Sequence, residues 1–321
     1  MEDCHCERSE AIHQETYLIR PKCWANSNMV FLNIQENLIS ENYWKSFAPD
    51  FHIADSSFWN FQEAFSVPEE TKAEMNDYML NEGFYKIDKS IVNYDPSKHA
   101  TLVKKLVSAN LLPVFAMIYD EFWLLQASAR NAMEAVLGTG YTIRPCMWVW
   151  HVDPKKEESG WYQHRDGDIN SLHEDKRPKV LSLWIPLTQA TPQNGCMYVK
   201  PMNREEVCVA TNKKADIACL QDMQALPAEA GDMYIWNFWV LHWGSKATKR
   251  AKEPRISVAF EIEEAGSNLL EAPLMDPFRM PSYEERLRII AYQIKQYMHM
   301  YKFNSTFLEF ADNALNTKII V

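Results

Sequence analysis

The stretch Pro254-Arg255-Ile256-Ser257-Val258-Ala259-Phe260-Glu261-Ile262 decides the fold class of this 321-residue chain. Successive side chains of a β-strand point to opposite faces. The apolar positions of this stretch share one face, and they are Ile256, Val258 and Phe260. The other face presents Arg255, Ser257 and Ala259. This alternation is expected of a barrel strand whose apolar face packs outward under helices and whose arginine looks into a pocket.

Short runs rich in aromatic and β-branched residues recur from Tyr141 to Ile262, with turn residues between them. The runs are Met147–Val152, Val180–Leu187, Met197–Lys200, Met233–Leu241 and Ile256–Ile262. Asn194-Gly195 is a strong hairpin signal between two of them. Many short strands separated by turns indicate a sandwich, barrel or jelly roll. We therefore expect a mainly β fold with flanking helices and a double-stranded β-helix core, a cupin-like jelly roll, over about 141–263.

Helices are expected on the N-terminal side of this core, over 68–137. Pro68 fits the first position of a helix that runs to Asn81, and a short strand, Gly83–Ile87, follows it. Apolar residues at alternating steps of three and four predict one long helix over Pro113–Leu137.

C-terminal helices are expected over 282–315, because Ser282 and Glu285 form a capping box before an apolar periodic run. The first of them would buttress the barrel or form the contact of a homodimer. The division that follows is an irregular N-terminal extension over 1–28 and a single domain over 29–321.

Composition excludes several classes of partner. The chain has 33 Lys and Arg against 43 Asp and Glu, a formal net charge of −10, and such an acidic surface repels nucleic-acid phosphates. No apolar run is long enough to span a bilayer, and residues 1–20 lack the apolar segment of a signal peptide. The sequence therefore predicts a cytoplasmic protein that binds neither nucleic acid nor a membrane.

The seven cysteines do not form a disulfide pattern, because their number is odd and their spacing irregular. Cys4-His5-Cys6 could be interpreted as a metal site, but it is short and has no partner pair elsewhere. We interpret these thiols as structural or incidental.

The candidate chemistry begins at Tyr162-Gln163-His164-Arg165-Asp166-Gly167. If this segment is extended, His164 and Asp166 project to the same side. Two ligands do not hold a catalytic metal firmly, so a third is needed, and His242 at the end of an aromatic strand is the candidate. Two histidines and one carboxylate are the ligand set of non-haem iron(II) oxygenases.

Arg255 follows His242 by thirteen positions and Ser257 comes two later. A guanidinium is the side chain best suited to bind a carboxylate through two hydrogen bonds, and Ser257 could add a hydroxyl donor.

Two alternatives stay open at the level of residues. An H-x-D pair alone is a weak signal, since His151-Val152-Asp153 is a second one. We favour His164 and Asp166 because His151 lies inside an expected strand and Pro154 follows Asp153 directly. The alternative to a metal site is that the three side chains are ordinary core or surface residues.

Several short motifs extend the pattern of the ligands. They are Glu82-Gly83-Phe84, His164-Arg165-Asp166, Leu183-Trp184-Ile185-Pro186-Leu187, Gln193-Asn194-Gly195-Cys196-Met197, Gly231-Asp232 leading to His242, and Arg255-Ile256-Ser257. With these motifs the chain resembles the phytanoyl-CoA dioxygenase family of iron(II)/2-oxoglutarate-dependent oxygenases over roughly residues 81–263.

The resemblance implies that His164, Asp166 and His242 are the iron ligands and the catalytic centre. It implies that 2-oxoglutarate binds the metal through its keto-acid end and Arg255 through its distal carboxylate, with Ser257 assisting. Dioxygen would be the other cosubstrate. The implied activity is hydroxylation of a small molecule with release of succinate and carbon dioxide, although desaturation or ring chemistry stays open.

One departure from the family concerns the loop Lys200-Pro201-Met202-Asn203-Arg204, which replaces the usual Pro-Gly-Ser-His run. It puts an acyl-CoA substrate in doubt. Two rival functions remain: a non-catalytic jelly-roll binding protein, and a cupin-type metalloenzyme that does not use 2-oxoglutarate.

Overall fold

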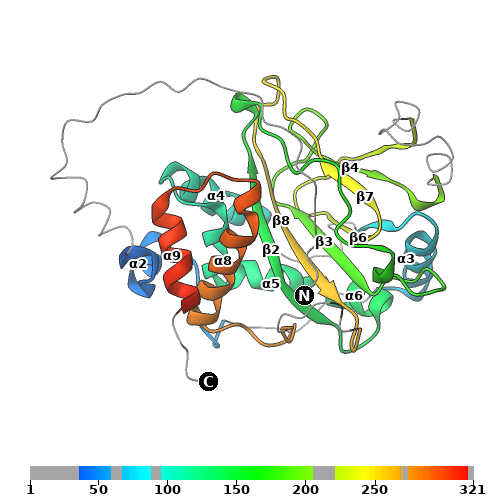
Figure 1. Cartoon of the computed structure of the whole chain (residues 1–321), viewed down its shortest axis with the longest axis horizontal. Coiled ribbons are helices and arrows are strands. Elements are labelled where there is room, and N and C mark those ends of the chain that lie inside the picture. The colour runs from blue at the N-terminus through cyan, green and yellow to red at the C-terminus, as the bar shows by residue number, and fades with distance from the viewer. Residues whose placement is uncertain are drawn as a thin grey trace.

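Two antiparallel sheets form the centre of the molecule (Figure 1). The computed structural model describes residues 36–58, 67–87, 95–204, 221–267, 269 and 274–316. The larger sheet has the strand order β1 (Phe84–Ile87), β6 (Met233–Asn237), β3 (Val180–Pro186), β8 (Arg255–Glu263) and β2 (Thr142–Val152). The smaller sheet has the order β5 (Gln224–Leu226), β4 (Met197–Lys200) and β7 (Leu241–Gly244). The expected jelly-roll core with flanking helices is confirmed.

The two faces of β8 meet different surroundings, as its alternation predicts. Its apolar face is completely buried in the main core, against side chains of the surrounding helices. The opposite face looks toward the smaller sheet, where a second apolar cluster contains Trp184, Tyr234 and Val199. The site lies beside this second cluster, between the two sheets.

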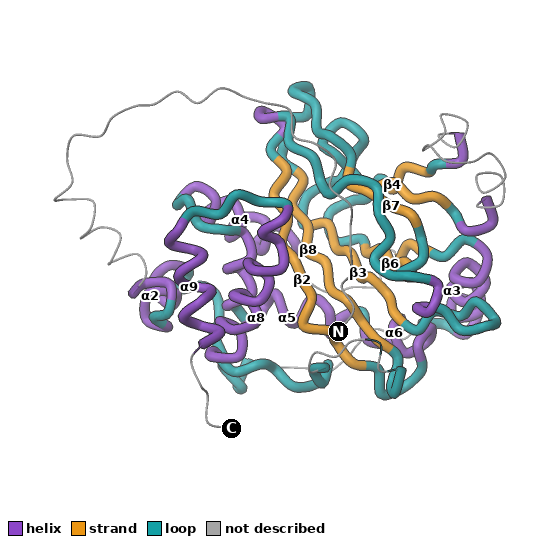
Figure 2. Tube along the Cα trace, in the orientation of Figure 1, coloured by secondary structure: helices purple, strands orange, loops and turns teal. Residues whose placement is uncertain are grey.

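Most helices cover the outer face of the larger sheet, on the side of β2 (Figures 1 and 2). They are α2 (Glu41–Phe47), α4 (Pro96–Ser108), α5 (Asp120–Ser128), α8 (Tyr283–Gln296), α9 (Ser305–Asn316) and the 3-10 turn η2 (Pro113–Ile118). Near β1 lie α3 (Glu69–Asn81) and α6 (Arg130–Leu137). Short 3-10 turns complete the described elements: η3 (Pro154–Lys156), η4 (Ile169–Ser171), η5 (Met202–Arg204) and η7 (Tyr297–His299).

Local signals predicted several of these elements correctly. The helix that begins after Pro68 and the strand after Gly83 are present as α3 and β1. The capping box of α8 is complete, because the Ser282 hydroxyl accepts from the Glu285 backbone and the Glu285 carboxylate accepts from the Ser282 backbone. α8 packs against β2 and α9.

The single helix expected over Pro113–Leu137 is wrong. The segment breaks at Tyr119, which is extended with φ −97° and ψ 141°, and bends again at Ala129. At the first break the Asp120 carboxylate accepts hydrogen bonds from the backbone N–H groups of Ala54 and Asp55. The apolar spacing over Pro113–Leu137 arose because this segment is buried on several sides, not because it forms one helix. Hydrogen bonds to distant parts of the chain stabilise the break.

The hairpin expected at Asn194-Gly195 is also wrong, although a turn is present there. Gly195 has φ 86°, the left-handed conformation that favours glycine, and a Cβ at this position would lie 2.5 Å from the Ser245 carbonyl oxygen. The strands on either side, β3 and β4, belong to different sheets. The turn therefore carries the chain from one sheet to the other.

The expected N-terminal extension cannot be compared with the structure, and the expected absence of a membrane span can be compared only in part. The irregular segment 1–28, with Cys4-His5-Cys6, lies outside the described residues, as does the chain after Arg204 up to 220. Within the described part, no helix combines the length and the apolar character needed to cross a membrane.

Candidate active site

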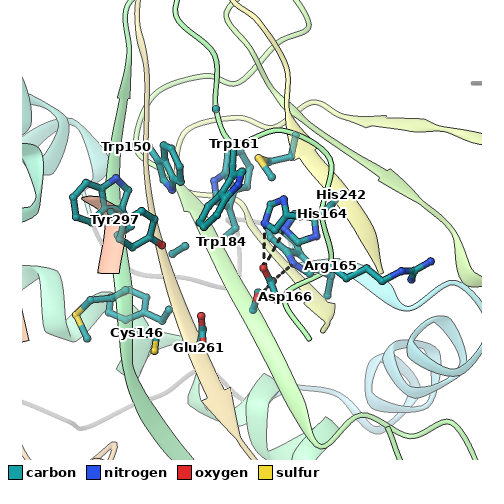
Figure 3. A pocket seen from close by; sticks show the side chains of 18 of the residues that line it. Cys146, Trp150, Trp161, His164, Arg165, Asp166, Trp184, His242, Glu261 and Tyr297 are labelled. Atoms are coloured by element: carbon teal, nitrogen blue, oxygen red, sulfur yellow. Dashed lines mark hydrogen bonds and ion pairs between the residues drawn. The ribbon is translucent and has the colours of Figure 1, made fainter. Parts of the chain in front are cut away.

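The structure brings together the three side chains singled out as metal ligands (Figure 3). One potential ligand atom from each of His164, Asp166 and His242 lies within 4.8 Å of the other two. Nε2 of His164 is 3.3 Å from Asp166 Oδ1, and Nε2 of His242 is 3.6 Å from the same oxygen. Among the described residues, no other trio of His, Cys, Asp or Glu side chains is this close.

Backbone pairing fixes the separation of the two histidines. His242 lies in β7, whereas His164 lies in an irregular segment that follows Gly160. The N–H of each residue donates to the carbonyl of the other at 3.0 Å, forming an isolated β-bridge. The bridge places the two ring centroids 4.3 Å apart on the side facing Asp166.

In both imidazoles the Nδ1 proton is donated to a backbone carbonyl. Nδ1 of His164 donates to the Tyr162 carbonyl at 2.6 Å, and Nδ1 of His242 donates to the Val240 carbonyl at 3.0 Å. A neutral imidazole carries one proton, so this tautomer leaves both Nε2 lone pairs facing Asp166. Burial lowers the pKa of His242, which keeps it neutral and able to bind a metal.

The Asp166 carboxylate is oriented by two donors. Its Oδ2 accepts from the Ser182 hydroxyl at 2.6 Å and from the Trp236 indole N–H at 3.1 Å. This leaves Oδ1 turned toward the histidines. Burial alone would raise the pKa of Asp166, but His242, His164 and the Ser182 hydroxyl together hold it below its ordinary value. One carboxylate oxygen and two imidazole nitrogens are a donor set that fits a divalent transition metal.

The second H-x-D pair has another role. Asp153 caps the turn η3 by accepting from the Lys155 backbone N–H at 2.9 Å. His151 pairs with Ile256 across β2 and β8, and neither residue joins the trio.

Arg255 is almost completely buried, and its guanidinium is left without a carboxylate. Nη1 donates to Ser257 Oγ at 2.8 Å, whereas Nε and Nη2 are buried without a hydrogen-bond partner. Burial lowers the pKa of Arg255 to about 10, so it stays positively charged at neutral pH. A buried and unpaired cation is costly unless an anion joins it, so its free donors mark a place for an anionic ligand.

Two glycines leave room around this guanidinium. Gly160 and Gly244 face each other, and a Cβ on Gly160 would lie 2.7 Å from the Gly244 Cα and 2.9 Å from Arg255 Nη2. A Cβ on Gly244 would lie 3.2 Å from the same Nη2. Any side chain at either position would fill space that the guanidinium and its ligand need.

The trio and Arg255 line one cavity of about 260 Å³. The residues that the sequence placed near the ligands divide into two groups. Trp161, Tyr162 and Trp236 line this cavity, and the Trp161 ring stacks on His164 with centroids 4.8 Å apart. Trp239 instead lies under the Arg165 guanidinium, and Trp243 stacks on Tyr198.

Several cavity residues escaped the sequence reasoning. They are Cys146, Trp148, Trp150, Ser182, Trp184, Glu261 and Tyr297. Continuing the two-residue alternation of β8 beyond Ala259 would have found Glu261, which faces the cavity from the same strand as Arg255. No local signal identifies Tyr297, because it reaches the site from the end of α8 through tertiary packing.

The sequence profile of the phytanoyl-CoA dioxygenase (PhyH) family matches residues 64–255, more than half of the chain. No curated protein sequence matches the chain at a significant level.

Solved structures with a similar fold include the non-haem α-ketoglutarate-dependent epimerase SnoN of nogalamycin biosynthesis (14% identity, 67% of this chain, 93% of that chain, TM-score 0.46). They also include EctD from S. alaskensis with 2-oxoglutarate and 5-hydroxyectoine (18%, 71%, 87%, TM-score 0.44). A third is HygX from Streptomyces hygroscopicus with nickel and 2-oxoglutarate (13%, 63%, 88%, TM-score 0.45). At these sequence identities and TM-scores, the activities of the neighbours are not assigned to this chain. The match of the family profile is sufficient by itself, and the chain belongs to the phytanoyl-CoA dioxygenase family.

Proposed function

We propose that this protein is an iron(II)- and 2-oxoglutarate-dependent oxygenase that hydroxylates a small molecule. The observation that carries the proposal is the pairing of two features in one cavity: a His-Asp-His trio and a buried arginine that lacks an anion. The first fits ferrous iron and the second fits a dicarboxylate that also reaches the metal. A non-catalytic binding protein of this fold has no need for both.

His164, Asp166 and His242 hold the iron, and Arg255 with Ser257 holds the distal carboxylate of 2-oxoglutarate. The bound iron and 2-oxoglutarate, with dioxygen, supply the oxidation that places a hydroxyl group on the substrate and releases succinate and carbon dioxide. The protein's own part is to position these groups. Ser182 and Trp236 fix the orientation of Asp166, and Trp161 covers one face of His164 against water.

Replacing Asp166 tests the metal assignment directly. Asp166→Ala removes the anionic ligand, and we expect metal affinity to fall by at least roughly 100-fold, the upper end of what loss of a supporting partner costs. Succinate release should fall with it. Iron binding and succinate formation are to be measured on the same preparation.

Asp168→Asn is the matched control, because Asp168 lies two residues away and caps η4 through the Asn170 backbone N–H. It should leave iron binding and succinate release unchanged. Wild-type iron affinity and turnover in Asp166→Ala would remove Asp166 from the ligand set and with it the proposed function.

A further inference from the structure

A phenol hydroxyl enters the metal-site cavity from the C-terminal helical region. Tyr297 lies where α8 ends and η7 begins, and it lines the same cavity as the trio. Figure 3 shows its hydroxyl directed into the cavity, toward the side on which His164 and Asp166 lie. Tyr297 lies beyond residues 64–255, the region that the family profile matches. The family motifs therefore do not supply this hydroxyl.

Ring contacts hold Tyr297 in position beside the metal ligands. Its ring stacks on Trp148 with centroids 4.3 Å apart and an interplanar angle of 21°. It also meets Trp161 edge-on at 5.5 Å, and Trp161 in turn stacks on His164 at 4.8 Å. α8 packs against β2, the strand that carries Trp148. The position of the phenol relative to the trio is thus set by packing, not by the hydroxyl itself.

The Tyr297 hydroxyl makes no hydrogen bond to any residue that the structure describes. Burial raises the pKa of Tyr297 well above its ordinary value, and the charges of Glu261 and Asp166 raise it further. The phenol therefore keeps its proton at physiological pH and remains a hydrogen-bond donor. A donor that faces an enclosed cavity without an acceptor leaves a place for a ligand oxygen.

The groups beside this hydroxyl offer a ligand little charge at neutral pH. Burial and the neighbouring Asp166 raise the pKa of Glu261 to about 8, so this cavity carboxyl is mostly protonated at pH 7. The charge of Arg144, which contacts Glu261 and Glu263, is then balanced by Glu263. Arg165 directs its guanidinium away from the trio (Figure 3). A charged substrate group at this position would lose water without gaining a counter-ion, which is costly.

We propose that the Tyr297 hydroxyl donates a hydrogen bond to an uncharged oxygen of the substrate, a hydroxyl or carbonyl group, and that this bond orients the substrate in front of the metal. The part of the substrate that enters the cavity is then neutral and oxygenated. A cavity of about 260 Å³, part of which 2-oxoglutarate occupies, limits that part to a small group such as a single ring. This inference rests on the proposed function, because it places the substrate by its position relative to the metal and 2-oxoglutarate.

The test uses probes that share a benzene ring and differ in one group: benzyl alcohol, toluene, benzylammonium and phenylacetate. Equilibrium dialysis measures the binding of each probe to full-length protein loaded with iron(II) and 2-oxoglutarate in the absence of oxygen. We expect benzyl alcohol to bind more tightly than either ion. Tyr297→Phe should weaken binding of the alcohol by roughly 2- to 13-fold, the range for one neutral hydrogen bond, and leave toluene binding unchanged.

Toluene separates the hydrogen bond from the packing, because it fills the same space without an oxygen. Tyr292→Phe is the matched control, since it removes a phenol hydroxyl from the same helix at a position that is 38% exposed and does not line the cavity. It should bind benzyl alcohol as the wild type does. Equal weakening of alcohol and toluene in Tyr297→Phe, unchanged affinity for the alcohol in that variant, or tighter binding of an ion than of the alcohol would overturn the inference.

The visible charge-transfer band of iron(II) with 2-oxoglutarate, recorded on the same samples, separates the two proposals. If the band forms in wild type and in Tyr297→Phe while both bind the alcohol equally, only the substrate inference is wrong. If the band is absent from the wild type, the proposed function is wrong.

Discussion

Arg286 in the helical layer and Arg255 in the cavity are both less than 2% exposed, but Arg286 has a carboxylate partner and Arg255 has none. Arg286 Nη1 is 2.5 Å from Asp120 Oδ1, and both side chains are inaccessible to solvent. Its other hydrogen bonds go to the backbone carbonyls of Pro281 and Ile118, at 2.9 and 2.7 Å. Arg255 has one neutral hydroxyl partner and two unpaired N–H groups.

This difference shows that burial of an arginine does not by itself indicate a ligand-binding role. Asp120 neutralises Arg286 and also accepts from two backbone N–H groups, so this ion pair joins α8 to η2, α5 and residues 54–55, although Nη2 of Arg286 has no hydrogen-bond partner. Arg255 is buried as deeply but has no carboxylate partner, which costs stability in the absence of a ligand. The absence of a carboxylate partner, rather than burial itself, marks the functional site.

The largest effect on stability is expected from Arg286→Met. It leaves the Asp120 carboxylate buried without its cation, which costs about 3–5 kcal/mol. Urea unfolding monitored by circular dichroism measures this loss. Arg255→Met is the matched variant, and the unliganded protein should lose no stability because no buried carboxylate is left behind. Equal losses in the two variants would show that Arg255 has a structural partner after all.

A smaller effect, on binding, is expected from Arg255→Met. Removing the guanidinium should weaken 2-oxoglutarate binding by about 1.5–3 kcal/mol, roughly 10- to 150-fold. Equilibrium binding in the presence of iron(II) without oxygen measures it. Arg286→Met, if folded at the assay temperature, should bind 2-oxoglutarate like the wild type. A wild-type dissociation constant in Arg255→Met would contradict the assignment of Arg255.

The smallest effect is expected from the exposed ion pair of Arg279 and Glu285, of which only Glu285 lies in α8 beside Arg286. Hydrogen bonds from Arg279 lower the pKa of Glu285 to about 2, from an ordinary value of 4.5. A lowered folded-state pKa contributes stability above pH 4.5 that is lost as the pH falls toward 2. Because both side chains are more than a third exposed, solvent reduces the contribution to about 0–1 kcal/mol.

Unfolding of wild type and Glu285→Gln at several pH values measures this contribution. The two proteins should differ slightly at pH 7 and converge as the pH falls through that window. A loss of stability as large as that of Arg286→Met would mean that solvent exposure does not explain the difference between the Arg279–Glu285 and Arg286–Asp120 ion pairs.

The sequence predicted those parts of the fold and the site that depend on local alternation. Arg255 and Ser257 were found because β8 alternates strictly, and α3 and α8 were found through their first-turn residues. His164, Asp166 and His242 were chosen by spacing and by the family motifs, and the structure brings them together.

The failures share one cause, which is long-range packing. The break at Tyr119 depends on hydrogen bonds from Ala54 and Asp55 to Asp120, far away in the sequence. The hairpin expectation failed because turn chemistry at Asn194-Gly195 does not specify which sheet the next strand joins. Tyr297 enters the cavity only because α8 packs against β2.

The most direct test of the central claim is an oxygen-free titration of the iron(II)-loaded protein with 2-oxoglutarate, followed through the visible charge-transfer band. We predict a saturable band in the wild type, no band in Asp166→Ala, and a band in Arg255→Met that needs roughly 10- to 150-fold more 2-oxoglutarate. Absence of the band from the wild type, or identical titrations of the wild type and Arg255→Met, would contradict the account.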